Sequence, residues 1–109
     1  MDLNGHVAVV TGASRGVGLK IAEALEARGM VVVSVARSAA RFTADVSSTE
    51  DVARLKTKVE TELGRPTIVV NAAGIFGPIA LVKDSDPSQW IETIMIDAVG
   101  PYLVSRAFL

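Results

Sequence analysis

A glycine-rich turn near the N-terminus has the residue types and the spacing to bind phosphate groups. The segment at 11–18 reads Thr-Gly-Ala-Ser-Arg-Gly-Val-Gly, with glycines at Gly12, Gly16 and Gly18. A helix N-terminus attracts phosphate because its first N–H groups are unpaired and the helix dipole is positive there. Glycines leave the backbone uncovered, so the phosphate can approach closely. We interpret the segment as a turn that holds the phosphates of a dinucleotide, with a merely structural turn as the alternative.

A buried strand and a helix must position this turn. The run at 6–11 (HVAVVT) is apolar up to its last residue, which predicts a strand buried on both faces. A helix is expected from about Gly16 to about Gly29, with its apolar residues on one face. Because a strand precedes the glycines and a helix follows them, the phosphate-binding interpretation is favoured.

The rest of the chain alternates in the same way between apolar runs and helical patterns. The other expected strands are 31–36, 42–44 and 67–71, and the other expected helices run from a capping box at Ser47 and Glu50 to Gly64 and from Asp86 to Leu109. Pro101 should bend the last helix, because its ring clashes with the carbonyl four residues earlier. A bare loop is expected at 37–41, since a few extended residues, at about 3.4 Å each, can return along a short strand. The alternation predicts an α/β fold, a doubly wound parallel sheet with helices on both faces.

Composition and charge restrict the class of protein. The chain has 109 residues, of which 50% are hydrophobic and 21% charged, as in a globular domain. The formal net charge of −1 argues against nucleic acid as a partner. There is no cysteine and no cluster of His, Asp or Glu with metal-ligand spacing, so no disulfide and no metal site is expected. No signal-peptide pattern and no apolar run of roughly 20 residues is present, so we expect a cytoplasmic protein without a membrane partner.

The spacing of the glycine turn and three later motifs resemble the short-chain dehydrogenase/reductase family. The turn has the form T-G-x-x-x-G-x-G rather than the commoner G-x-G-x-x-G. Asp45-Val46 follows the third expected strand, and Asn71-Ala72-Ala73-Gly74, similar to the family's N-N-A-G, follows the fourth. Residues 96–101 (IDAVGP) resemble the family's N-x-x-G-P segment. The motifs occur in the family's order along the whole chain, which makes them more specific together than any one alone.

This resemblance implies a fold, a cofactor and an activity. The fold is a Rossmann-like sheet with strand order 3-2-1-4, and the activity is hydride transfer between a nicotinamide cofactor and an alcohol or carbonyl. Asp45 would hold the adenine amino group, and the segment from Asn71 to Gly74 would stabilise the sheet and border the ribose. The implied cofactor-binding residues are Gly12, Ser14, Arg15, Gly16, Val17, Gly18, Arg37, Asp45, Val46, Asn71, Ala72, Ala73 and Gly74.

The residues expected beside the adenosine ribose favour NADP(H), with NAD(H) as the alternative. A carboxylate at the end of the second strand would bond the 2′-hydroxyl and repel a 2′-phosphate. This chain carries Arg37 there, and Arg15 lies within the glycine turn. A guanidinium binds phosphate in forked geometry, and in the family basic residues at these two positions accompany NADP preference. The alternative is that both arginines are ordinary surface charges.

The proton-transfer residues that the family implies are missing from these 109 residues. The family uses a Tyr in Y-x-x-x-K together with a Ser, and these belong to elements that follow the last helix predicted here. The single tyrosine, Tyr102, precedes Arg106 at that spacing, but it comes too early in the fold. Arginine also titrates too high to share protons as lysine does, so Tyr102 is expected to be a packing residue.

Asp97 occupies the position at which the family has an Asn that holds a water in its proton relay. An Asp at this position can support a local helix distortion and accept hydrogen bonds. It offers no amide donor, however, and it adds a negative charge near the site. Asp97 is therefore the one candidate catalytic residue in the chain, and the Asp either alters the relay chemistry or is a neutral variation.

Two classes of function follow from these observations. The first is the NADP(H)-binding N-terminal part of an oxidoreductase, with residues 1–109 forming a Rossmann-like domain that is incomplete at its C-terminus and has no turnover of its own. The second is a catalytically silent cofactor-binding or dimerisation module from a truncated product. Because the last helix is apolar almost all round, it is expected to pair with a second copy or a full-length relative. Trp90 is expected in the core or in such an interface.

Overall fold

The four predicted strands form one parallel sheet in the computed structural model, which describes residues 2–109. The strand order is β3-β2-β1-β4, which confirms the predicted Rossmann-like topology. The strands are β1 (Val7–Thr11), β2 (Val31–Ala36), β3 (Phe42–Thr43) and β4 (Ile68–Asn71). The central strand β1 pairs on both sides, with Val9 opposite Val33 of β2 and opposite Val69 of β4.

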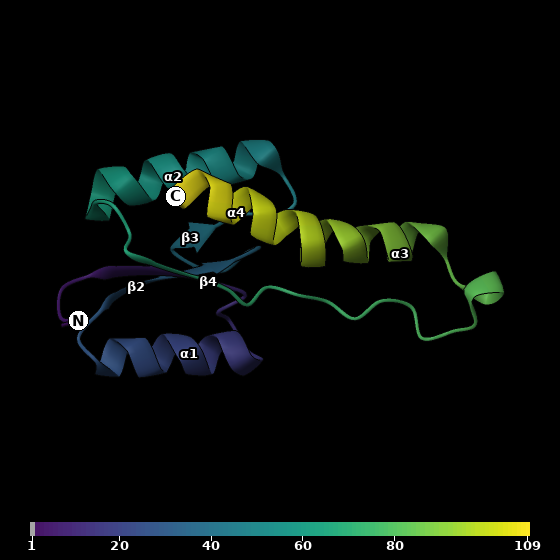
Figure 1. The fold of residues 1–109 in the computed structure, drawn as a ribbon, viewed down its shortest axis with the longest axis horizontal. Coiled ribbons are helices and arrows are strands. Elements are labelled where there is room, and N and C mark those ends of the chain that lie inside the picture. The colour runs from purple at the N-terminus through teal and green to yellow at the C-terminus, as the bar shows by residue number, and fades with distance from the viewer. Residues whose placement is uncertain (1) are drawn as a thin grey trace.

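Helices cover both faces of this sheet. They are α1 (Gly16–Ala27), α2 (Thr49–Leu63), the 3₁₀ turn η1 (Val82–Asp84), α3 (Pro87–Ile94), the π-helical segment η2 (Met95–Val99) and α4 (Gly100–Phe108). In Figure 1, α1 lies on one face, whereas α2 and α4 lie side by side on the other. The helix formed by α3, η2 and α4 extends beyond the sheet, which gives the molecule its long axis of 50 Å.

The alternation of side chains along β1 explains why its sequence is apolar up to Thr11. Val9 belongs to the larger core, which the sheet forms with α2 and α4, while Val10 belongs to the smaller core beneath α1. The larger core also contains Val59 of α2 and Val104 of α4, both fully buried. A strand that faces a helix layer on each side needs hydrophobic residues on both faces, as predicted for the residues before Thr11.

The connection from β2 to β3 is a loop without a helix, as we predicted from the small number of residues between the two strands. Residues 37–41 join the two strands, and Val35 lies opposite Phe42 in parallel register. The strand β3 is one residue shorter than expected, because Ala44 already leaves the ladder, although its amide N–H still bonds the Ala36 carbonyl at 3.0 Å.

The predicted capping box of α2 is wrong by one residue. The N-cap is Ser48, whose hydroxyl accepts the N–H of Asp51 at 3.2 Å. Ser47 lies one residue before the cap, and its hydroxyl and its amide N–H both donate to the carboxylate of Asp45. The predicted N-cap of the last helix is confirmed, because the side chain of Asp86 accepts the N–H of Ser88 at the start of α3.

Pro101 was expected to bend the last helix, and the structure shows a local widening of the helix beside it. Pro101 lies in the first turn of α4, and the π-helical segment Met95–Val99 comes directly before it. A proline lacks the N–H for the usual helical bond, and its ring needs space at the carbonyl of Asp97. The wider turn supplies that space, as π-helical insertions do elsewhere in long helices.

Candidate functional site

A cleft of about 930 Å³ opens at the carboxyl ends of β1, β2 and β4. It lies at the point where the strand order reverses, because the chain leaves β1 towards β2 on one side and later returns to β4 on the other. Open α/β sheets bind their ligands at this switch point. Eleven of the predicted cofactor-binding residues line it, namely Gly12, Ser14, Arg15, Gly16, Val17, Gly18, Arg37, Val46, Ala72, Ala73 and Gly74. Asp45, Asn71 and Asp97 are not among its lining residues.

The three glycines of the turn have different physical roles. A Cβ on Gly12 would lie 2.6 Å from the Ala73 Cα, and one on Gly18 would lie 2.2 Å from the Gly12 carbonyl oxygen. Those two glycines therefore let backbone segments pack directly against each other. Gly16 has a φ of +61°, and a Cβ there would meet nothing within 4 Å. Its missing side chain leaves open space at the start of α1.

The N-terminus of α1 has no protein cap. The N-cap position is Arg15, in extended conformation, and within residues 2–109 no side chain accepts a hydrogen bond from the first turn. By contrast, α2 and α3 begin with side-chain caps, from Ser48 and Asp86. Unpaired N–H groups at a helix start favour an anion, which would complete the first turn of α1.

Thr11 fixes the geometry of the cleft floor, a role that we did not predict for it. Its side chain is buried, with 1% of the residue exposed, and its hydroxyl oxygen accepts the N–H groups of Ala72 and Ala73, each at 3.2 Å. These bonds tie the end of β1 to the segment after β4. The signal in the sequence is a polar residue that ends an otherwise apolar buried strand, because a buried hydroxyl must find partners.

The charged residues among those that line the cleft are Arg15 and Arg37. Among the described residues no carboxylate lines it, so the charged side chains of the lining itself are positive. The side chain of Arg37 is 59% exposed, and its Nη2 lies 3.5 Å from Oε1 of Glu92 on α3. Arg15 is exposed at the opening and forms no ion pair within the described part of the chain. This charge distribution fits a phosphorylated ligand.

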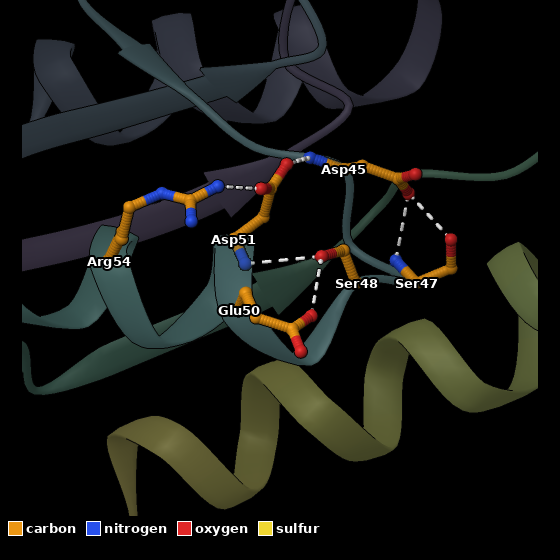
Figure 2. A network of polar contacts seen from close by, with 6 residues as sticks. All are labelled: Asp45, Ser47, Ser48, Glu50, Asp51 and Arg54. Carbon is orange, nitrogen blue, oxygen red and sulfur yellow. Dashed lines mark hydrogen bonds and ion pairs between the residues drawn. The ribbon is translucent and has the colours of Figure 1, made fainter.

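Asp45 is held beside the cleft by the polar network shown in Figure 2. Its Oδ1 accepts the Ser47 hydroxyl at 2.6 Å and the Ser47 amide N–H at 3.0 Å. Its own N–H donates to Oδ2 of Asp51 at 2.9 Å, and Arg54 pairs with the other oxygen of Asp51. The two hydrogen bonds from Ser47, and the positive charge of Arg37, lower the pKa of Asp45 below its ordinary value of 3.8.

Asn71 and Asp97 do not line the cleft, but their hydrogen bonds stabilise the segments that form its wall. The Asn71 side-chain amide donates to the Ser105 hydroxyl at 3.1 Å, which links β4 to α4. Oδ1 of Asp97 accepts the N–H of Ile75 at 2.9 Å from within the π-helical segment. Asp97 therefore combines the helix distortion and the acceptor role that were expected of it.

Two aromatic residues of the last helix lie outside the core. Tyr102 is 62% exposed and Trp90 is 56% exposed. The prediction that Tyr102 packs is therefore wrong within this chain, and Trp90 is not a core residue. Both lie on the helix formed by α3, η2 and α4, whose buried residues Ile96, Val104 and Phe108 face the sheet and α2. The spacing of apolar residues alone did not distinguish the covered face from the uncovered one.

Within residues 2–109, no group of three or more His, Cys, Asp or Glu side chains comes close enough together to hold a metal ion. None of the helices described is both long and apolar enough to span a bilayer.

The parallel sheet, the cleft at its switch point and the uncapped helix after a glycine turn define a Rossmann-like α/β protein. The particular family follows from comparison with known proteins. The chain belongs to the short-chain dehydrogenase family, whose family model matches residues 6–109.

Three relatives illustrate this similarity. The chain is 38% identical to the 3-oxoacyl-(acyl-carrier-protein) reductase FabG of Pseudomonas aeruginosa, covering 100% of this chain and 51% of FabG. A metagenomic short-chain oxidoreductase solved in complex with NADP superposes with a TM-score of 0.90 at 33% identity, over 99% of this chain and 57% of that one. A blue fluorescent protein from a metagenomic library, in complex with NADPH, has a TM-score of 0.88 at 26% identity, over 99% and 51%. The chain thus spans about half the length of these relatives.

Proposed function

We propose that this chain is the NADP(H)-binding part of an oxidoreductase that transfers hydride between the nicotinamide and an alcohol or carbonyl substrate. The observation that carries the proposal is the cleft, where an uncapped helix start meets two arginines and no carboxylate. Solved relatives that hold NADP and NADPH support the choice of cofactor.

Each group of residues would bind a different part of the cofactor. The open backbone at Gly16 and the first N–H groups of α1 would hold the linking phosphates. Arg15 and Arg37 would hold the 2′-phosphate, and Asp45 with Val46 would border the adenine. The remaining residues that we propose for binding are Gly12, Ser14, Val17, Gly18, Asn71, Ala72, Ala73 and Gly74. When bound, the nicotinamide would give or accept the hydride, and these residues would hold the cofactor in position.

Asp97 is a positioning residue in this proposal. Through Ile75 it fixes the segment after β4, which forms one wall of the cleft. Tyr102 is not assigned the proton-transfer step, because it does not line the cleft. In the resembled family that step belongs to residues beyond the last helix, so residues 1–109 are proposed as the cofactor-binding domain and not as the whole reaction centre.

A catalytically silent module is the second candidate function. It is favoured by the uncovered apolar side chains on the helix of α3, η2 and α4, which fit pairing with a second copy or a full-length relative. These exposed residues are Trp90, Ile91, Ile94, Met95, Tyr102 and Leu109. Sedimentation of the purified chain tests pairing with a second copy, since a monodisperse monomer would contradict self-association through this helix.

Titration of NADPH and NADH against the wild type and Arg37→Glu tests the proposed cofactor. The wild type should bind NADPH more tightly, and Arg37→Glu should weaken NADPH binding by at least about tenfold, because a charge-assisted bond is lost and a repulsion is gained. Arg41→Glu is the matched control, since Arg41 pairs with Glu62 and does not line the cleft. If Arg37→Glu leaves the preference unchanged, the NADP(H) assignment fails.

A further inference from the structure

The ion pair between Arg37 and Glu92 joins the cleft to a helix that is distant in sequence. Arg37 follows β2 and lines the cleft, whereas Glu92 lies on α3 and does not line it. Nη2 of Arg37 and Oε1 of Glu92 are 3.5 Å apart, and the two side chains are 59% and 54% exposed. Both partners are therefore accessible to a ligand that enters at the end of β2.

The same guanidinium cannot serve Glu92 and a 2′-phosphate equally well. A phosphate is bound best by the planar fork of an arginine through parallel N–H donors, and one of the terminal nitrogens of Arg37 already faces a carboxylate. A carboxylate beside the phosphate site also repels the phosphate charge directly. A cofactor without the 2′-phosphate meets neither effect, because it leaves the ion pair in place.

We propose that Glu92 is a specificity-determining residue that weakens NADP(H) binding relative to NAD(H) by competing for Arg37. The inference rests on the proposed function, in which the cleft binds NADP(H) through Arg37. It adds a residue on α3 that sets how strongly the 2′-phosphate is preferred. Glu92 acts through its charge on Arg37 and on the phosphate, not through contact with the reacting atoms.

The direction in which NADPH affinity changes when Glu92 is removed shows whether Glu92 competes for Arg37 or orients it. If Glu92 served to hold Arg37 in place for the phosphate, its removal would weaken NADPH binding. Exposed ion pairs hold side chains only weakly, so little orientation is gained, whereas the repulsion of a nearby carboxylate on a phosphate persists. Removal of the charge should therefore tighten NADPH binding.

The test compares Glu92→Gln with Glu62→Gln in titrations with NADPH and NADH. Glu62 is a matched control because its carboxylate also forms an exposed ion pair, with Arg41 at 3.3 Å, away from this cleft. Glu92→Gln should tighten NADPH binding by about two- to fivefold and leave NADH binding unchanged, as expected for one exposed charge pair. The gain should shrink as ionic strength rises. Glu62→Gln should change neither affinity.

Titrations with adenosine 2′,5′-bisphosphate and with 5′-AMP isolate the contribution of the 2′-phosphate to binding, because only the first ligand carries it. Glu92→Gln should bind the bisphosphate more tightly than the wild type does and should bind 5′-AMP with unchanged affinity. Glu92→Ala is a second variant for which the same result is expected, and thermal unfolding checks that both variants are folded. Unchanged or weaker NADPH binding in folded Glu92→Gln would overturn the inference while leaving the proposed function standing. If the wild type binds neither dinucleotide, the proposed function itself fails, whatever Glu92 does.

Discussion

Replacing Gly16 with alanine separates phosphate binding by the turn from its structural role. The new Cβ would meet nothing within 4 Å, so the change creates no clash within the protein. Its φ of +61° is left-handed, which costs an L-residue about 1–2 kcal/mol. For a domain of this size the melting temperature should fall by about 4–8 °C for each kcal/mol. The methyl group would project where the cofactor phosphates approach, so NADPH affinity should fall by at least about tenfold.

Gly64→Ala is the matched control for backbone strain. Gly64 ends α2 with a φ of +91°, a Cβ there also meets nothing within 4 Å, and the residue does not line the cleft. Its backbone conformation is essentially restricted to glycine, so the loss of stability should be at least as large as for Gly16→Ala. Thermal unfolding and NADPH titration of both variants should show two destabilised proteins, of which only Gly64→Ala keeps its affinity. Wild-type affinity in Gly16→Ala would refute the assignment of the turn to phosphate binding.

Substitutions at three further residues test the side chains that shape the cleft. Thr11→Val removes the acceptor of two partly buried N–H groups and should lower the free energy of unfolding by about 1–3 kcal/mol, measured by urea denaturation. Ser47→Ala should raise the pKa of Asp45 towards 3.8. A depressed carboxylate pKa stabilises the fold fully above the ordinary value of 3.8, and this stabilisation is lost as the pH falls through the folded-state pKa. In acid-unfolding curves, the stability difference between wild type and variant should therefore be largest above 3.8 and should disappear once the pH is below the lowered pKa of Asp45 in the folded wild type. Asp97→Asn keeps an acceptor for Ile75 and should match the wild type in urea denaturation, whereas Asp97→Leu should lose about 0.5–1.5 kcal/mol.

The sequence predicts the sheet well because burial on both faces leaves an unambiguous pattern. A strand such as β1 is apolar on both faces up to Thr11, and the glycine turn after it marks both its end and the start of α1. The short loop from β2 to β3 was also predictable, because chain length limits what can connect two parallel strands. Eleven cleft-lining residues were predicted from motifs, since the carboxyl ends of parallel strands meet at one edge.

Side-chain hydrogen bonds were harder to predict, because several residues compete for the same partners. Ser47 and Ser48 are both plausible caps by spacing, and the choice depends on the bonds that Asp45 makes with Ser47 in three dimensions. The pairing of Arg37 with Glu92 depends on where α3 lies relative to β2, which no local pattern encodes. The exposure of Tyr102 similarly depends on which face of α4 the sheet covers.

The N-termini of α1, α2 and α3 differ in their caps, and this difference explains why a ligand in the cleft should stabilise the folded protein. Ser48 and Asp86 cap α2 and α3, and such caps typically contribute about 1 kcal/mol each. The start of α1 has no such cap, and Gly16 leaves it open to the cleft. An anion that binds there supplies the missing acceptors only in the folded state, so its binding free energy adds to the stability of the fold. The stabilisation of the fold by bound phosphate should be strongest for the phosphates at the start of α1. It should be weaker for the 2′-phosphate, because Glu92 already pairs with Arg37 and that ion pair must open first.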